Sequence, residues 1–175
     1  MIFQTIRLQI YKLKASDTDA FFDMMGNPKV MNPIPQEAMT HKQSDAKLAE
    51  LLKYDNPKVQ VWAIHFNDEF IGICGLLIND EGNPEIAYRL REVFWGEGFG
   101  TEIAKGLLDY GFGDLGFELI TADVNITNIP SVKILEKFFI AVREFYNPKD
   151  KCTDRRYHLE RKDYWYARNF ACISC

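Results

Sequence analysis

Long hydrophobic runs are absent from this sequence. Its longest nearly unbroken apolar stretch, Phe70 to Ile78, falls far short of the roughly 20 residues that a helix needs to cross a bilayer. The N-terminal region also lacks a basic segment that leads into an apolar one, so no secretory signal is visible. We therefore expect a cytoplasmic protein with no membrane partner.

Residues that bind metals or form disulfides are also scarce. The sequence has four cysteines and three histidines, and the histidines are scattered. Cys172 and Cys175 form a C-x-x-C pair, but zinc normally needs a second pair or histidines at a suitable spacing. A disulfide framework is not expected in a cytoplasmic chain of this size. We expect reduced thiols and no metal.

The sequence has no excess of basic residues. Lysine and arginine number 21 against 25 aspartates and glutamates, which gives a net charge of −4. Asp154 to Lys162 is locally basic, but acids are interleaved with its arginines, so we interpret it as a solvated strand edge. A nucleic-acid partner is therefore not expected, whereas a mildly acidic protein is compatible with a cationic partner such as an amine.

What the sequence does contain is the composition of a soluble globular protein. Its 175 residues are 47% hydrophobic and 26% charged, enough for a substantial core without disulfides. No repeat, linker or low-complexity stretch interrupts the chain. We expect one domain over residues 1–175, with a C-terminal tail at about 163–175, in a monomer or a homodimer.

Hydrophobic periodicity predicts a mixture of strands and helices. Alternation predicts strands at about 6–10, 59–66, 69–78, 84–90, 118–124, 140–146 and 154–160, the second and third joined as a hairpin by Asn67-Asp68. Helical spacing and caps predict helices at 17–26 after Ser16, at 40–54 from Thr40, at 100–114, and at 128–138 from Asn128. The loop Asn27 to Gln36 carries three prolines. This order indicates an α+β fold with a mixed, mainly antiparallel sheet.

The stretch "WGEGFGTE", Trp95 to Glu102, lies where a strand pattern gives way to a helix. It lacks the lysine of a Walker loop, and its G-x-G-x-G spacing differs from the dinucleotide fingerprint G-x-G-x-x-G. Glycines before a helix can nevertheless expose several amides, and the helix dipole favours an anion there. On spacing alone, a phosphate cradle and a purely structural turn are equally supported.

Several stretches together resemble the GNAT superfamily of N-acetyltransferases, and more narrowly its ribosomal-protein N-acetyltransferase branch. "WGEGFGTE" resembles the branch's "WGkGyaTE", and "FIGICGL" and "PEIAYRL" resemble "fIG..gl" and "aeiGYwl". The opening "IRLQIYKLKASDTDAFFDMMGNPKVM" and the later "NITNIPSVKILEKF" also have counterparts, in the same order. The resemblance covers roughly Ile6 to Tyr146.

This resemblance implies a GNAT fold, with acetyl-CoA held between the splayed strands 84–90 and 118–124. The Leu90 N–H is the candidate to polarise the thioester carbonyl. The expected cofactor contacts are the backbone near Tyr88, Leu90 and Arg91, the pyrophosphate loop of Trp95, Gly96, Glu97, Gly98, Phe99, Gly100 and Thr101, and, near the thiol, Asn128 and Ser131.

The resemblance also implies direct acetyl transfer to a primary amine, such as a ribosomal-protein N-terminus or a small-molecule amine. Glu85 is the candidate base, with a solvent-facing strand residue as the alternative interpretation; Glu144 is a weaker candidate. Ser131 would lie near the sulfur or would simply stabilise the helix start. The helix lacks the acidic tyrosine of many relatives, and Tyr146 is a distant substitute. A catalytically weak acyl-CoA-binding or sensor protein is the competing function.

The sequence departs from the family pattern at Phe139, where the family has glycine after the helix. Glycine permits a tight helix exit, so we expect an altered turn into the next strand. The strand glycine of the family is Ala87 here, which is a milder change. Neither difference removes an expected cofactor contact.

Overall fold

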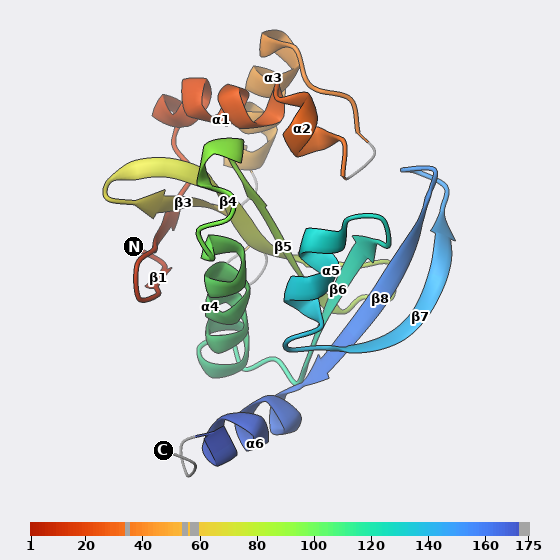
Figure 1. Ribbon diagram of the computed structural model, residues 1–175. Helices are drawn as coiled ribbons and strands as arrows, with labels where there is room; N and C mark the ends of the chain where they lie inside the picture. The colour runs from red at the N-terminus through yellow and green to blue at the C-terminus, as the bar shows by residue number, and fades with distance from the viewer. Residues whose placement is uncertain (34–35, 54–55, 57–59, 172–175) are drawn as a thin grey trace.

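The computed structural model describes residues 1–33, 36–53, 56 and 60–171 (Figure 1). The strands of its sheet are β1 (Phe3–Gln4), β2 (Gln9–Lys12), β3 (Val61–Phe66), β4 (Glu69–Ile78), β5 (Pro84–Leu90), β6 (Leu119–Asn125), β7 (Ile140–Asn147) and β8 (Cys152–Glu160). The α-helices are α1 (Thr18–Met25), α2 (Pro28–Met31), α3 (His41–Lys53), α4 (Phe99–Gly113), α5 (Ile129–Leu135) and α6 (Arg161–Ala171). Single 3₁₀ turns span Ala15–Asp17 and Glu92–Phe94.

All of these strands belong to one sheet in the order β1-β2-β3-β4-β5-β6-β8-β7. Every pairing is antiparallel except that of β5 with β6, which are parallel and paired only at Glu85 and Thr121. Beyond this pair the two strands diverge (Figure 1). The expected α+β fold with a mixed, mainly antiparallel sheet and a splayed strand pair is therefore confirmed.

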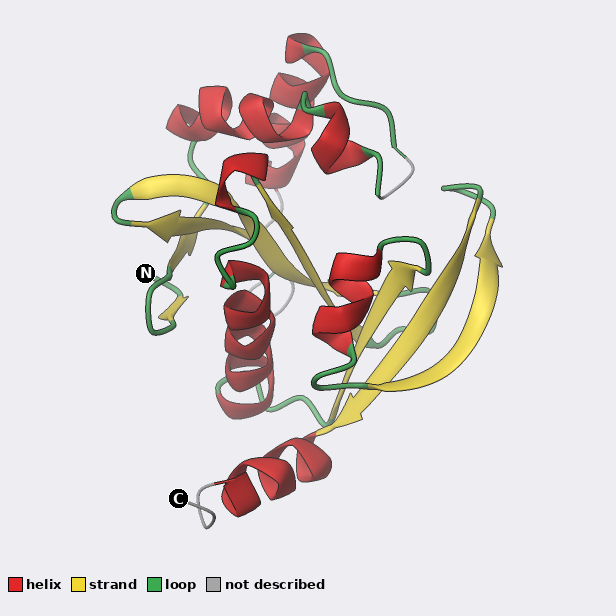
Figure 2. Cartoon of the chain, viewed as in Figure 1, coloured by secondary structure: helices red, strands yellow, loops and turns green. Residues whose placement is uncertain are grey.

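Helices pack against the sheet around two hydrophobic cores (Figure 2). The larger core joins α4 and α5 to the sheet and contains Trp62, Ile86 and Leu107. The smaller core lies under α1, α2 and α3 and contains Phe21 and Met31. Side chains alternate along a strand, so β5 sends Ile86, Tyr88 and Leu90 to the first core and its odd-numbered residues to the other side.

Local backbone angles and hydrogen bonds explain why the sequence predicted the central hairpin and the start of α3. Asn67 and Asp68 both have positive φ angles, 49° and 64°, which is the backbone of a tight two-residue hairpin turn. Thr40 caps α3: its N–H donates to the Gln43 side chain at 2.8 Å, and the Gln43 N–H donates back to its hydroxyl at 3.4 Å.

The expected first strand is wrong in part. Thr5 and Leu8 form a tight turn, in which the Thr5 N–H donates to the Leu8 carbonyl at 2.9 Å and the Leu8 N–H to the Thr5 hydroxyl at 3.0 Å. This turn leaves Ile6 exposed between β1 and β2. Ser16 is not the cap of α1 either; Asp17 is, and its carboxylate accepts from the Lys14 N–H at 2.8 Å.

The interpretation of Asp154 to Lys162 as a solvated strand edge is also wrong. This segment forms most of β8, which lies between β6 and β7, and Arg156 and Tyr157 are fully buried in it. Arginine can occupy such a position because carboxylates surround its guanidinium. β7 is the strand at this edge of the sheet.

Helix α6 covers most of the segment, about 163–175, that we expect from the sequence to be a C-terminal tail. Tyr164 is buried against the ring of Phe112, and its hydroxyl donates to Asp109 at 2.8 Å. Cys172 and Cys175, the expected reduced thiols, lie outside the described residues. Phe139, in place of the family glycine, is buried in the larger core immediately before β7.

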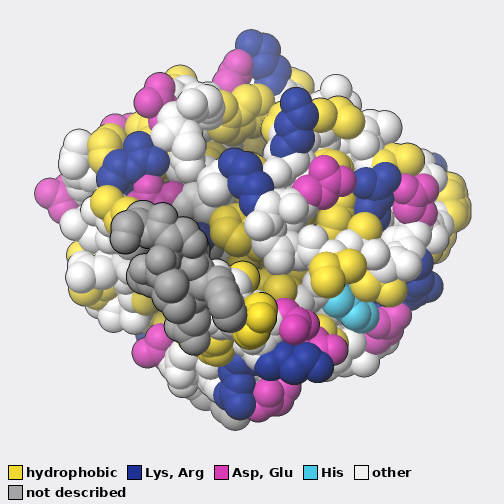
Figure 3. All heavy atoms as spheres, turned by 60° about the horizontal axis from the view of Figure 1, so that its bottom comes forward, with side chains coloured by type: hydrophobic (Ala, Val, Ile, Leu, Met, Phe, Trp, Pro, Cys, Tyr) yellow, Lys and Arg dark blue, Asp and Glu magenta, His cyan; other side chains and the backbone are white. Residues whose placement is uncertain are grey.

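The surface charges and the polarity of the helices are consistent with the mixed composition of the sequence. On the face shown in Figure 3, acidic and basic side chains are interspersed. No described helix has both the length and the apolar character needed to span a bilayer.

Candidate active site

The gap between β5 and β6 exposes an unpaired backbone edge. The Arg91 N–H donates to the Ile71 carbonyl at 2.9 Å, so these opposite residues form a hydrogen-bonded pair. Hydrogen-bonded and non-hydrogen-bonded pairs alternate along an antiparallel ladder. The N–H groups of Leu90, opposite Gly72, and of Tyr88, opposite Cys74, therefore point away from β4 and into the gap.

The two strands are held together at the closed end of the gap by Thr121. Its buried hydroxyl donates to the Pro84 carbonyl at 3.0 Å and accepts from the Asn79 amide at 3.1 Å. At the open end, the Trp95 indole N–H donates to the Leu90 carbonyl at 3.0 Å. The Leu90 carbonyl is thus occupied, whereas its N–H faces the gap.

The glycine loop leads from β5 into α4 with a left-handed backbone. Gly96 and Gly98 have φ angles of +83° and +81°, which side chains rarely adopt, and Gly98 caps α4. The first intrahelical bond runs from the Glu102 N–H to the Gly98 carbonyl at 3.1 Å. The amides of the three preceding residues accordingly have no acceptor within the helix.

Gly100 has a different role from the other two glycines. A Cβ atom at this position would lie 2.8 Å from Ile134 Cδ1 on α5 and 3.9 Å from the Tyr88 ring. The absence of a side chain therefore allows α4 to approach α5 and β5 closely. The loop combines two residues that turn the backbone with one that permits this approach.

Two side chains that are far apart in the sequence hold the glycine loop in place. Arg7 donates to the Glu97 carbonyl at 3.0 Å, forms an ion pair of 2.7 Å with Glu102, and stacks on the Phe99 ring. Lys137, just after α5, donates to the Thr101 hydroxyl at 3.1 Å. Both cations add positive charge beside the free amides.

A cavity of about 580 Å³ follows this edge and loop. Most of the expected cofactor residues line it, namely Tyr88, Leu90, Trp95, Gly96, Gly98, Phe99, Gly100, Thr101, Asn128 and Ser131. The side chains of Arg91 and Glu97 do not: Arg91 forms ion pairs with Asp23 and Glu69, and Glu97 contributes its carbonyl to Arg7. The free strand edge and the free amides fit an extended, phosphate-bearing ligand such as acetyl-CoA.

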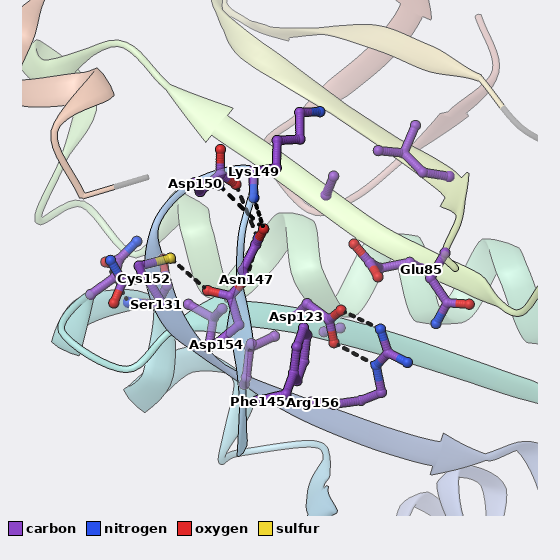
Figure 4. Close-up of a pocket in the computed structure, with 18 of the residues that line it drawn as sticks. Glu85, Asp123, Ser131, Phe145, Asn147, Lys149, Asp150, Cys152, Asp154 and Arg156 are labelled. Atoms are coloured by element: carbon purple, nitrogen blue, oxygen red, sulfur yellow. Dashed lines mark hydrogen bonds and ion pairs between the residues drawn. The ribbon is translucent and has the colours of Figure 1, made fainter. Parts of the chain in front are cut away.

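A second cavity, of about 720 Å³, opens on the other side of the gap (Figure 4). It lies between β5, β6 and the hairpin of β7 and β8, and the loop residues Pro33 and Gln36 also line it. The two cavities share Pro33, Tyr88, Arg89, Asn128 and Ser131 in their walls. A reaction between ligands held in the two cavities would therefore take place near Tyr88 and Ser131.

Glu85 points into this second cavity from β5 (Figure 4). Burial is the largest cause that raises the pKa of its carboxyl from 4.5 to about 8, and the nearby carboxylate of Asp123 adds to the rise. Arg156 acts in the opposite direction. A carboxyl with this pKa can exchange a proton close to neutral pH, as a general base must.

Arg156 connects the acids beneath Glu85. Its guanidinium donates two hydrogen bonds to Asp123, at 2.9 and 2.7 Å (Figure 4). It also forms ion pairs with Asp80 and Glu81 in the turn before β5. These contacts hold the pKa of Asp80 below its usual value. The network joins β6, β8 and the turn that leads into β5, and so fixes the floor of the cavity.

Ser131 and Tyr88 meet at the junction of the two cavities. Asn128 caps α5 by accepting from the Ser131 N–H at 3.4 Å, which leaves the Ser131 hydroxyl available for another role. The Tyr88 hydroxyl is buried next to the Ser131 side chain, which acts to lower its pKa, but it forms no hydrogen bond of normal geometry with any described residue. Burial raises the pKa of this phenol to about 12, so it remains protonated.

The weaker catalytic candidates lie farther from this junction. Glu144 is on the exposed strand β7, forms an ion pair with Arg155 at 2.7 Å and does not line the cavity. Tyr146 lines the second cavity but is largely exposed. No local pattern distinguishes Arg89, Lys137 or the Tyr88 hydroxyl from ordinary strand and helix residues, so their places in the site could not be predicted from the sequence.

No set of three or more His, Cys, Asp or Glu side chains within the described ranges is arranged to hold a metal ion. The site is instead defined by a free strand edge, a glycine-capped helix and two cavities that meet between them. These are the features of an enzyme that brings two substrates together, one of them extended and anionic.

Comparisons with known sequences identify the family. Residues 7–138 match the family model of the acetyltransferase (GNAT) domain. The chain is 32% identical over 137 residues to the N-acetyltransferase p20 of Bacillus licheniformis, which covers 75% of this chain and 77% of that protein. The chain belongs to the GNAT acetyltransferase family and is an acetyl-CoA-dependent acetyltransferase.

Solved structures agree in fold. A GNAT-family acetyltransferase from Bacillus anthracis superposes with a TM-score of 0.79 at 20% identity, over 91% of this chain and 98% of that one. The spermidine N-acetyltransferase of Vibrio cholerae, solved in complex with CoA and spermine, superposes with a TM-score of 0.75 at 17% identity, over the same shares of the two chains.

Proposed function

We propose that this protein transfers the acetyl group of acetyl-CoA directly to a primary amine that enters through the second cavity. The observation that carries the proposal is the meeting of two cavities at Tyr88 and Ser131, beside the unpaired edge of β5. The V. cholerae neighbour, which binds CoA and spermine, supports an amine acceptor for this fold.

On the cofactor side, the chain's groups bind and orient. The free amides at the start of α4 donate to the pyrophosphate, and the unpaired edge of β5 binds the pantetheine arm as an added strand would. The Leu90 N–H, which faces the gap, donates to the thioester carbonyl. Acetyl-CoA itself supplies an activated acetyl group with a thiolate leaving group.

On the acceptor side, the residues move protons. Glu85, directly or through a water molecule, takes the proton that the amine must lose in order to attack. The Ser131 hydroxyl, with the protonated Tyr88 phenol beside it, donates to the departing thiolate. The proton acceptor therefore lies in the second cavity, and the proton donor lies at the junction of the two cavities.

The charges in the second cavity favour a protonated amine. Acidic residues in its lining are Asp80, Glu85, Asp123, Asp150 and Asp154, and the basic ones are Arg89, Lys149 and Arg156. The charge of Arg156 is neutralised by its ion pairs with Asp80, Glu81 and Asp123. The same ion pairs engage Asp80 and Asp123, and Glu85 holds a proton near neutral pH. With Glu85 protonated, the acids in the lining outnumber the basic residues by four to three, and this small excess favours a cation.

Free-thiol release with acetyl-CoA, measured across a panel of amines, tests the proposal. The panel contains polyamines, amino sugars, amino acids and a peptide with a free N-terminal amine, the acceptor class of the ribosomal-protein branch. We expect turnover of a small-molecule amine and an acetylated product that mass spectrometry identifies. Reactions without acceptor supply the hydrolysis background.

Calorimetric binding of acetyl-CoA accompanies these assays and separates the alternatives. Tight binding without turnover of any amine would refute the proposed activity and favour an acyl-CoA-binding or sensor protein. Turnover of the peptide alone would replace the small-molecule acceptor by a protein N-terminus. Failure to bind acetyl-CoA at all would mean that the glycine loop is only structural.

A further inference from the structure

Arg89 carries a charge that the described structure does not neutralise. It lies on β5 between Tyr88 and Leu90, and it forms no ion pair with any acid in the described ranges. The only hydrogen-bond acceptors of its guanidinium among these residues are two methionine sulfurs, Met25 at 3.0 Å and Met31 at 3.3 Å. Its Nε is buried and has no partner. Thioether sulfur is a weak acceptor, so most of the guanidinium's hydrogen-bonding capacity is unused.

This arrangement is costly unless something else binds there. Arg89 is half-buried, and its Nε is shielded from water. A cation in such a place loses part of its hydration, and proteins normally compensate with a carboxylate. Burial lowers the pKa of Arg89 to about 10, which still leaves it charged at neutral pH. The nearest acid that acts on it is Asp150, whose carboxylate is already held by the Asn147 and Gln36 amides at 3.2 and 3.4 Å.

The position of Arg89 relates this unused charge to the reaction. Arg89 lines both cavities, and its guanidinium lies against Met25 of α1 and Met31 of α2. Side chains alternate along β5, which places Arg89 on the same side as Glu85, about 13 Å away along the strand at about 3.3 Å per residue. Glu85 and the acids around Arg156 occupy the other end of the same cavity (Figure 4).

We propose that Arg89 binds a carboxylate of the acceptor, so that the acceptor is an amino acid or a related amine that carries its own carboxylate. A guanidinium offers parallel N–H donors that match the two oxygens of a carboxylate. The acceptor's carboxylate binds Arg89, and its amine lies at the junction beside Tyr88 and Ser131, within the second cavity that Glu85 also lines. This inference rests on the proposed function and extends it, because a polyamine or a protein N-terminus has no carboxylate to place there.

Matched pairs of acceptors test the proposal. Each pair consists of an acid and its neutral primary amide: α-amino acids with their α-amides, and straight-chain ω-amino acids of increasing length with theirs. We expect kcat/KM to favour the acid by about 10- to 100-fold, the range for one charge-assisted, bidentate contact. The chain length at which this preference peaks reports the separation between the reacting amine and Arg89.

Three variants assign the preference to this residue. Arg89→Met keeps an unbranched apolar stem among the methionines, and we expect it to abolish the acid preference while amides keep their turnover. Arg89→Lys keeps the positive charge but lacks the parallel N–H donors of a guanidinium, so we expect it to retain part of the preference that Arg89→Met loses. Lys149→Met removes a charge from an exposed position of the same cavity and should change the preference much less. Acetyl-CoA affinity and the melting temperature report the folding of each variant.

The outcomes distinguish this proposal from the proposed function. Equal use of acids and amides by the unaltered protein, or an equal loss for both in Arg89→Met, would overturn the carboxylate site. Turnover of polyamines alone would overturn it too, and would leave the acetyltransferase proposal standing. If no amine is turned over, calorimetric binding of the acids and amides in the presence of CoA decides: tighter binding of the acids, lost in Arg89→Met, supports the site, and equal binding refutes it.

Discussion

Replacement of Glu85 by glutamine tests the acid–base assignment, because one ionisation should govern both stability and rate. The pKa of this carboxyl rises from 4.5 in the unfolded chain to about 8 in the folded protein. Between these values the folded protein holds a proton that the unfolded chain has lost. Stability therefore falls as pH rises from about 4.5 to 8, and the loss is complete above 8.

The magnitude follows from the same two values. At 1.36 kcal/mol for each tenfold change, the rise corresponds to at most about 5 kcal/mol, and solvent access to a partly buried side chain reduces this to about 2–4 kcal/mol. Glu85→Gln has no such ionisation. We expect its free energy of unfolding, relative to the unaltered protein, to increase by that amount between pH 4.5 and pH 8, because the other titrating groups are common to both.

The rate should follow the same ionisation. For an acceptor amine whose own pKa is well below 7, so that its free-base fraction is constant, kcat/KM of the unaltered protein should rise with pH through about 8, where Glu85 loses its proton. Glu85→Gln should lose this limb together with about 10²- to 10⁴-fold in rate. Urea unfolding and thiol-release assays over the same pH series supply the two measurements.

Glu144→Gln is the matched control, since it removes an exposed acid that pairs with Arg155 outside the cavity. We expect its rate to stay within a few fold of the unaltered protein and its pH profile to be unchanged. If Glu85→Gln keeps the rising limb, the titrating group is another one, and Glu85 is not the base. If the difference in unfolding free energy stays constant with pH, the raised pKa itself is refuted.

Four further substitutions have distinct expected results. Gly98→Ala and Gly82→Ala should each cost about 1–2 kcal/mol of stability, because both glycines have φ near +80°, but only Gly98→Ala should weaken acetyl-CoA binding in calorimetry. Tyr88→Phe removes a hydroxyl without a partner, so its melting temperature should not fall while kcat drops by about tenfold or more. Arg156→Met leaves Asp123 without its bidentate partner and should cost about 3 kcal/mol or more in urea unfolding. Because Arg156 lowers the pKa of the candidate base, the rising limb should also move to higher pH.

The sequence predicted those parts of the fold that depend on neighbours along the chain. The hairpin of β3 and β4, strand β5 and helix α4 follow from periodicity and turn residues, which act over a few positions. The prediction of a strand that includes Ile6 is wrong because alternation alone does not reveal the turn that Thr5 and Leu8 close. In this case a specific hydrogen bond overrode a hydrophobic pattern.

The arginines show most clearly what local patterns could not predict. Arg156 and Arg155 are adjacent in a basic segment, yet Arg156 is fully buried and bonded to Asp80, 76 positions earlier, whereas Arg155 forms ion pairs near the surface. The burial of Arg156 depends on β8 lying between β6 and β7. Strand order is a property of the whole sheet, so no short window of sequence contains it.

The same distinction explains why most residues that line the first cavity could be named from the sequence, whereas only Glu85 and a few others of the second could. The cofactor side uses backbone groups of one continuous stretch, from Tyr88 to Thr101, and its glycines are visible as residues. The acceptor side uses side chains from β5, β6, β8 and the loops, which the fold brings together. Relatives can therefore share the fold at about 20% identity and differ in acceptor. Strand β5 belongs to both cavities, because its free edge faces the first, Glu85 lines only the second, and Arg89 lines both. Substitution of Glu85 should therefore alter the use of the acceptor and leave cofactor binding intact.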